Sequence, residues 1–168
     1  MDKQIILLSG KNGSGKDTIG YFLTKKFDYE RIAFADALKD EVYHEYSSLF
    51  EFSRNDLDTN KEMILSTGYT LRKLIIQYAT LRREYDKDVW AKIVVNRILS
   101  SKKHKFVITD WRFENEYEYL IRFFNNVKTY QVTRENVISD EIPMKGDIVI
   151  ENNGSIEDLY KRCKRIFN

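Results

Sequence analysis

The strongest indication of the fold comes from residues 5–18, which read Ile5-Ile6-Leu7-Leu8-Ser9-Gly10-Lys11-Asn12-Gly13-Ser14-Gly15-Lys16-Asp17-Thr18. Its first four residues form a short apolar block, which is typical of a strand buried on both faces of a sheet. A polar stretch with three glycines follows, and residues 19–27 then carry apolar side chains at helical spacing. The chain therefore opens with a strand, a glycine-rich loop and a helix.

The loop matches the pattern G-x-x-x-x-G-K, and the flanking strand and helix are the context that this pattern requires. Its glycines let consecutive backbone N–H groups point at one anion, and the helix N-terminus adds a positive end. Lys16 supplies a point charge for the β- and γ-phosphates of a nucleotide. The residues expected to hold ATP here are Gly10, Lys11, Asn12, Gly13, Ser14, Gly15, Lys16, Asp17 and Thr18.

The position after the lysine departs from the usual pattern. A serine or threonine there ordinarily holds Mg²⁺ through its hydroxyl, whereas this chain has Asp17 followed by Thr18. Asp17 is expected either to bind the ion through a water molecule or to stabilise the first helical turn electrostatically. The sequence leaves both roles open.

Further along the chain, strands alternate with helices, with one long helical interruption. Strands are expected at residues 31–34, 106–109, 127–133 and 147–150, and a last helix begins at Ser155. Right-handed crossovers place helices on both faces of a parallel sheet. We therefore expect one domain over residues 1–168, an α/β three-layer fold with a five-stranded parallel sheet. A helical substrate-binding insertion is expected at about 36–101, with 51–60 irregular, and a short lid-like segment at about 135–147.

Composition narrows the class of function. Lys and Arg total 28 against 26 Asp and Glu, and this near-balance provides no strong field for nucleic acid or an acidic membrane. The single cysteine, Cys163, excludes an internal disulfide and fits a reducing compartment. Neither a basic leader nor an apolar run of membrane-spanning length is found. We expect a soluble cytoplasmic protein with no stable nucleic-acid or membrane partner, and the sequence leaves open whether it is a monomer or a homodimer.

Charged residues follow two of the expected strands, where an open α/β sheet presents its ligand crevice. Asp110 is expected to hold Mg²⁺ through water, and Arg112 to bind a transferring or acceptor phosphate. Alternatively, Asp110 caps the following helix and Arg112 pairs with Glu116. Asp36 and Lys39 share one helical face and are expected to contact a sugar or base and a phosphate. Asp36 fits equally well as a helix cap.

The helical insertion offers donors for an acceptor. Arg72 and the cluster Arg82-Arg83 would bind a phosphomonoester, while Gln77, Thr80 and Trp90 would suit a base. The alternative is that the arginines form a solvated helix face and that Trp90 belongs to the core stripe of its helix.

Several stretches together resemble the deoxynucleoside monophosphate kinase family of phages and large DNA viruses. They cover most of the chain and are Gly13-Ser14-Gly15-Lys16-Asp17-Thr18, Phe34-Ala35-Asp36-x-Leu38-Lys39, Leu71-Arg72-x-x-Ile75-x-Gln77-x-Ala79-Thr80, Asp88-x-Trp90, Thr109-Asp110-x-Arg112-Phe113-x-Asn115-Glu116, and Asn152-Asn153-Gly154-Ser155. The family ordinarily has Asp17 in its loop. This chain departs from it at Ala79, usually glycine, and at Leu81-Arg82-Arg83, where an acidic residue and a spaced arginine are usual.

The resemblance implies a P-loop kinase fold and roles for residues outside the loop. It implies that the monophosphate site is lined by Arg72, Gln77, Thr80 and Trp90, that the acceptor or metal is served by Asp110, Arg112 and Glu116, and that the ATP base is bordered by Arg134, Asn153 and Gly154. The cation that closes the lid stays open, with Lys145 a candidate.

The sequence therefore predicts in-line transfer from MgATP to the 5′-phosphate of a ribo- or deoxyribonucleoside monophosphate, with Lys16, Asp110 and Arg112 as catalytic residues. A viral source would place this reaction in deoxynucleotide biosynthesis in the host cytoplasm. One alternative is a P-loop kinase of another small acceptor, such as a coenzyme A precursor. Another is a nucleotide-binding regulatory module that performs no transfer.

Overall fold

The computed structural model describes residues 3–168 and contains one five-stranded parallel sheet in the order β2-β3-β1-β4-β5. The strands are β1 (Gln4–Ser9), β2 (Glu30–Ile32), β3 (Lys105–Ile108), β4 (Asn126–Thr133) and β5 (Ile148–Glu151). The central strand β1 pairs in parallel with β3 on one side and with β4 on the other. The predicted five-stranded parallel sheet is confirmed.

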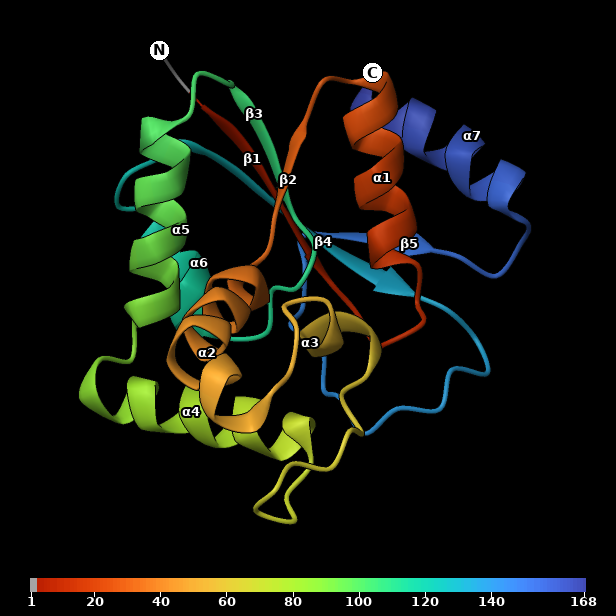
Figure 1. Cartoon of the computed structure of the whole chain (residues 1–168). Coiled ribbons are helices and arrows are strands. Elements are labelled where there is room, and N and C mark those ends of the chain that lie inside the picture. Colours follow the sequence, from red (N-terminus) through yellow and green to blue (C-terminus); the bar gives the residue numbers. More distant parts are fainter. Residues whose placement is uncertain (1–2) are drawn as a thin grey trace.

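Helices cover both faces of the sheet, as predicted (Figure 1). They are α1 (Lys16–Lys26), α2 (Phe34–Phe50), α3 (Asp56–Thr59), α4 (Leu71–Tyr85), α5 (Val89–Ser100), α6 (Glu114–Leu120) and α7 (Ile156–Phe167). Helices α1 and α7 pack on one face and α2, α5 and α6 on the other, with α4 against α2. Alternate residues of β1 enter the two cores: Ile5 and Leu7 face α2 and α5, and Ile6 and Leu8 face α1 and α7.

The face covered by α1 and α7 contains the chain's one cysteine. Cys163 of α7 is fully buried with Ile6 and Leu8 of the central strand. Burial raises the pKa of its thiol to about 11. Ser155 caps this helix, as predicted, because its hydroxyl accepts the N–H of Asp158.

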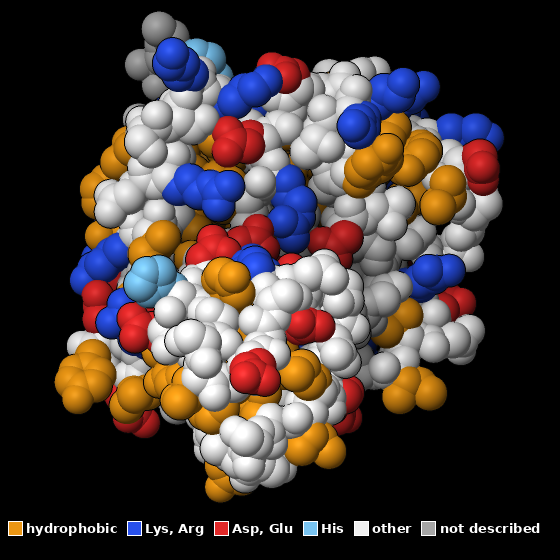
Figure 2. Space-filling model, viewed as in Figure 1, with side chains coloured by type: hydrophobic (Ala, Val, Ile, Leu, Met, Phe, Trp, Pro, Cys, Tyr) orange, Lys and Arg blue, Asp and Glu red, His pale blue; other side chains and the backbone are white. Residues whose placement is uncertain are grey.

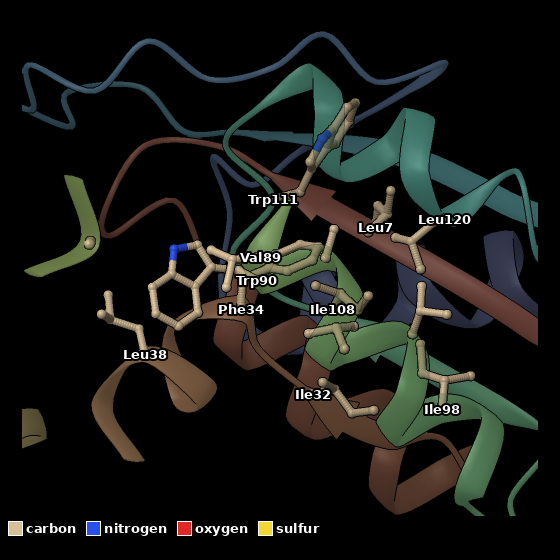
Figure 3. Packing of buried hydrophobic residues seen from close by; sticks show 14 of the residues in the cluster. Leu7, Ile32, Phe34, Leu38, Val89, Trp90, Ile98, Ile108, Trp111 and Leu120 are labelled. Carbon is tan, nitrogen blue, oxygen red and sulfur yellow. The ribbon is translucent and has the colours of Figure 1, made fainter. Parts of the chain in front are cut away.

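The other core contains Trp90, which was expected to line the acceptor site. Its side chain is 2% exposed, and Figure 3 shows it packed with Phe34, Leu38 and Val89. Trp90 therefore belongs to the core stripe of α5, and the expectation that it lines the site is wrong.

The segment between α2 and α4 is more ordered than predicted. Residues 51–60 were expected to be irregular, but they contain α3, which buries Leu57. The Asp56 carboxylate accepts from both the backbone N–H and the hydroxyl of Ser53, and these bonds hold the turn that leads into the helix. One helical turn is too short to show apolar periodicity, which is why the pattern missed it.

Residues 134–147, which join β4 to β5, contain no helix or strand. In Figure 1 this light-blue segment crosses the lower part of the view before it returns to β5. Its far end is fixed because Thr129 and Asp147 exchange two hydrogen bonds, of 2.6 and 2.9 Å. Among the described residues, no helix is long and apolar enough to cross a membrane.

Candidate active site

The glycine-rich loop lies where β1 ends and α1 begins, and its shape requires glycine. Gly10 has a φ of 149°, and a Cβ there would lie 2.4 Å from the carbonyl oxygen of Val132. Gly15, at the N-cap of α1, has a φ of 106°. A side chain at either position would distort the backbone, so the loop can curl as a phosphate cradle only with these residues.

Asn152 fastens this loop to the sheet, and sequence reasoning missed its role. Its side-chain amide donates to the carbonyl oxygen of Ser14 at 2.8 Å, and it is buried. A Cβ on Gly15 would lie 2.4 Å from that amide nitrogen. Its position directly after β5, at the carboxyl edge of the sheet, was the available signal.

Lys16 folds back over the loop in this structure. Its Nζ donates to the carbonyl oxygens of Gly10 and Lys11 at 2.6 and 2.8 Å. Burial lowers the pKa of this amine, an effect partly offset by nearby carboxylates. The hydroxyl of Ser14 is buried with no partner among the described residues. A curled loop, a half-buried cation and an unpaired hydroxyl fit a nucleotide's phosphates.

A cavity of about 500 Å³ opens beside the loop and brings several predicted residues together. It is lined by the loop from Asn12 to Thr18, by Arg134 and by Gly154. A second cavity of about 430 Å³ adjoins Arg134 and includes Asn153. The structure thus places the three residues expected at the ATP base next to the phosphate loop, and their contacts with the base stay a prediction.

The two carboxylates expected near the metal have different surroundings. Asp17 is 82% exposed and lies 3.9 Å from the guanidinium of Arg31. Asp110 accepts the backbone N–H groups of Phe34 and Ala35 at 2.9 and 2.8 Å. Asp110 therefore supports the N-terminus of α2, not the following helix. Burial raises the pKa of its carboxyl, while these two N–H groups act in the opposite direction.

Within residues 3–168, no group of three Asp, Glu, His or Cys side chains that could hold a metal ion is found. Mg²⁺ in proteins is usually bound by one or two carboxylates together with water and substrate phosphates. Asp17, Thr18 and Asp110 are the residues that would complete its shell.

Asp36 of α2 pairs with a basic side chain, and Lys39 of the same helix pairs with an acidic one. Asp36 is not the helix cap, since that position belongs to Ala33; its carboxylate pairs with Arg31 at 2.9 Å. Lys39 pairs with Asp58 of α3 at 2.6 Å. Figure 2 shows acidic and basic side chains gathered near the middle of this face, over the region between α1 and α2.

Glu116 supports the backbone rather than reaching for a ligand. It is 3% exposed, and one oxygen accepts the N–H groups of Arg112 and Phe113 at 3.0 and 3.1 Å. Burial raises the pKa of this carboxyl to about 7. The expectation that Glu116 contacts substrate therefore needs correction: it positions the turn that presents Arg112. The guanidinium of Arg112 pairs with Glu141, not with Glu116.

Arg83 of α4 reaches the same turn from the helical insertion. Its guanidinium lies over the ring of Phe113, 4.4 Å from the centroid. Burial lowers its pKa, and the charge of Arg112 adds to this effect, whereas Glu116 and Asp110 oppose it. Arg83 therefore lies within electrostatic range of Asp110 and Arg112, and its contact with an acceptor stays a prediction.

Lys61 was not singled out from the sequence, yet it lies within electrostatic range of three other cations. Burial and then the charges of Lys39, Arg72 and Arg112 lower its pKa, and the charge of Asp58 opposes them. Its carbonyl oxygen accepts the N–H of Arg72 at 2.8 Å, which ties the loop to the start of α4. Within the part of the chain that the structure describes, no carboxylate forms an ion pair with Lys61. No sequence pattern pointed to Lys61, because Lys61 and the cations around it come from four separate segments of the chain.

Two other predicted residues are on the exposed side of α4. Gln77 is exposed, and the hydroxyl of Thr80 donates to the carbonyl of Ile76 on its own helix. Their contact with an acceptor stays a prediction. Lys145, the candidate lid cation, is exposed.

Comparison with known proteins supports the kinase class. No family model matches the chain. A dephospho-CoA kinase of Fusobacterium nucleatum is 28% identical over 193 aligned residues, which cover 98% of this chain and 97% of that protein. This similarity indicates a P-loop kinase-like protein, and it does not support a specific link to the viral deoxynucleoside monophosphate kinases.

Solved structures share the fold. A Thermus thermophilus protein superposes with a TM-score of 0.59 at 17% identity, over 99% of this chain and 97% of that one. Dephospho-CoA kinase of Campylobacter jejuni gives a TM-score of 0.57 at 12% identity, over 99% and 96%. The chain has a P-loop kinase fold. ATP and Mg²⁺, the cofactors expected from the sequence, agree with its kinase relatives.

Proposed function

We propose that this protein transfers the γ-phosphoryl group of MgATP to a small acceptor that itself carries phosphate. The observation that supports this most directly is the curled glycine-rich loop with Lys16 at the start of α1, within electrostatic range of Arg112. On the acceptor side, Lys39 and Arg72 lie within electrostatic range of Lys61, and each pairs with a carboxylate, on Asp58 and Glu62. An acceptor phosphate would compete with these carboxylates for the same N–H donors.

The roles of the residues follow from the chemistry of in-line transfer. The loop amides and Lys16 would hold the β- and γ-phosphates, and Arg112 would neutralise charge on the transferring group. Asp110 would hold a water molecule of Mg²⁺, and this ion would supply positive charge that neutralises the phosphate oxygens. Positioning and charge neutralisation, rather than covalent chemistry by the protein, would supply most of the rate.

Two acceptors fit this proposal. A nucleoside monophosphate presents a phosphate oxygen as its own nucleophile, and it is favoured by the likeness of the motifs around Arg72 and Arg112 to the viral kinases. Dephospho-CoA presents a hydroxyl group, and it is favoured by the Fusobacterium relative. The comparisons support the second acceptor better than the first. A role in deoxynucleotide biosynthesis would follow only from the first.

The test is ADP release from MgATP, measured by a coupled assay with each common ribo- and deoxyribonucleoside monophosphate and with dephospho-CoA. Phosphorus NMR of the product separates the two chemistries, because a nucleoside monophosphate gives a diphosphate and dephospho-CoA gains a separate phosphomonoester. If ATP binds but no acceptor stimulates ADP release, the proposed transfer is wrong and a nucleotide-binding module is the better interpretation.

A further inference from the structure

The segment of residues 134–147 delivers a carboxylate, not a cation, to the candidate active site. The Oε1 atom of Glu141 lies 3.0 Å from a terminal nitrogen of Arg112. Among the charges around Lys16, that of Glu141 has the largest effect, and it raises the pKa of the Lys16 amine. One carboxylate therefore lies within electrostatic range of both cations that are expected to hold the transferring phosphoryl group.

A carboxylate in this position resembles a phosphate in charge and in hydrogen-bonding capacity. Arginine binds both groups through the same planar set of N–H donors. Lys16 meanwhile donates to carbonyls of its own loop, at 2.6 and 2.8 Å. Both cations thus have internal partners, and a nucleotide phosphate has to replace them.

We propose that Glu141 is an internal competitor of the donor phosphates: it holds Arg112 and the segment 134–147 over the site until the γ-phosphate of MgATP displaces it. This inference rests on the proposed function only for the place of the donor phosphates. It requires no acceptor and no transfer.

The construction of the segment supports a second position for it. Its two ends are fixed, by Thr129 to Asp147 and by Asn153, which exchanges hydrogen bonds with Glu135. Between these ends, Ile138 and Ile142 are 100% and 92% exposed. Side chains this exposed show that the middle of the segment makes few packing contacts, so release of Glu141 would leave it free to move away.

The first test is the dissociation constant of the magnesium complex of AMPPNP, measured by calorimetry at fixed ionic strength. Glu141→Gln removes the competing charge and should tighten binding about three- to tenfold, the range expected for a partly exposed charge-assisted pair. Asp140→Asn makes the same charge change at the neighbouring exposed position and should leave binding unchanged. Equal or weaker binding by Glu141→Gln would overturn the proposal.

The second test follows the segment itself by hydrogen exchange. In the wild type, AMPPNP should accelerate amide exchange in residues 138–146; in Glu141→Gln, exchange there should already be fast without nucleotide. Unchanged or slower wild-type exchange on binding would contradict displacement.

The two proposals fail differently. A silent acceptor panel combined with tighter AMPPNP binding by Glu141→Gln would reject the proposed transfer and retain the competitor. Absence of AMPPNP binding in all three proteins would reject both.

Discussion

The proposed donor and acceptor sides of the candidate site are built from different parts of the chain. The donor side is backbone: a contiguous glycine-rich loop curls at the end of β1, and Asn152 fastens it to the sheet. The acceptor side consists of long cationic side chains from separate segments. Lys39 and Arg72 each pair with a nearby carboxylate, on Asp58 and Glu62. A backbone site has one shape, whereas a side-chain site can adjust, so the donor is better specified than the acceptor.

The most direct test of the donor side is to remove Lys16, the lysine at the start of α1. Lys16→Ala should lower kcat/KM about 10⁴-fold, the order of a cation that neutralises phosphoryl transfer, while the fold is retained. The measurement is coupled ADP release with the best acceptor of the panel, alongside a thermal melt. Lys25→Ala, in the last turn of the same helix, is the control. Near-normal activity in Lys16→Ala would contradict the assigned site.

Alanine substitutions at two glycines compare how tightly the backbone is packed on the two sides of the site. Gly10→Ala should lower the free energy of unfolding by about 3–4 kcal/mol, because positive φ is combined with a backbone clash at Val132. Gly68, in the loop before α4, has a φ of 78° but open space around it. Gly68→Ala should cost only about 1 kcal/mol. Urea unfolding followed by circular dichroism measures both, and equal losses would show that the loop is not tightly packed.

The pH dependence of stability tests whether Glu116 is buried beneath the turn that presents Arg112. Its carboxyl has a pKa of about 7 in the fold against an ordinary 4.5. Between these values the unfolded chain is ionised there and the folded chain keeps the proton, so stability should fall as pH rises from 4.5 to 7. Over this pH range, Glu116 is expected to lower the free energy of unfolding by about 3 kcal/mol. Glu116→Gln should remove it, as judged from urea unfolding at several pH values.

The control is Glu114→Gln, which changes an exposed acid in the same helical turn. An identical pH slope in the wild type and Glu116→Gln would mean that Glu116 is not buried as described.

Substitution of Lys61 should have the smallest effect on the kinetics, and that effect should be limited to the acceptor. Lys61→Met should raise KM for the acceptor about tenfold, the value of one charge-assisted contact, with KM for ATP unchanged. Lys73→Met is the matched control, because Lys73 is an exposed residue of α4 that lies over Tyr69. A change in KM for ATP instead would place Lys61 on the donor side.

Sequence patterns were sufficient for the fold because they are local. The apolar block of β1 and the glycine spacing after it specify strand, loop and helix without any distant information. The details that failed depend on distant contacts. The second strand ends at Ile32 rather than residue 34, because Asp110 binds the N–H of Phe34 and starts α2 there.

The candidate site divides in the same way. Lys16 and its loop follow directly from a motif, whereas Lys61 and Asn152 acquire their surroundings only through tertiary contacts. Trp90 shows the reverse error: a family-like position suggested a ligand contact, and its helical periodicity, which indicated the core, was the better guide. Glu116 likewise looked like a ligand-binding acid, but its carboxylate is used by two backbone N–H groups.

The buried thiol of Cys163 has a practical consequence. With its pKa raised to about 11, the thiolate that reacts with maleimides is scarce at neutral pH, and the side chain is buried on the inner side of α7. In thiol labelling the protein should therefore behave as if it had no cysteine. A single cysteine introduced at the fully exposed Ile138 would carry one fluorophore or spin label, so the segment's position could be followed in solution with every core residue left in place.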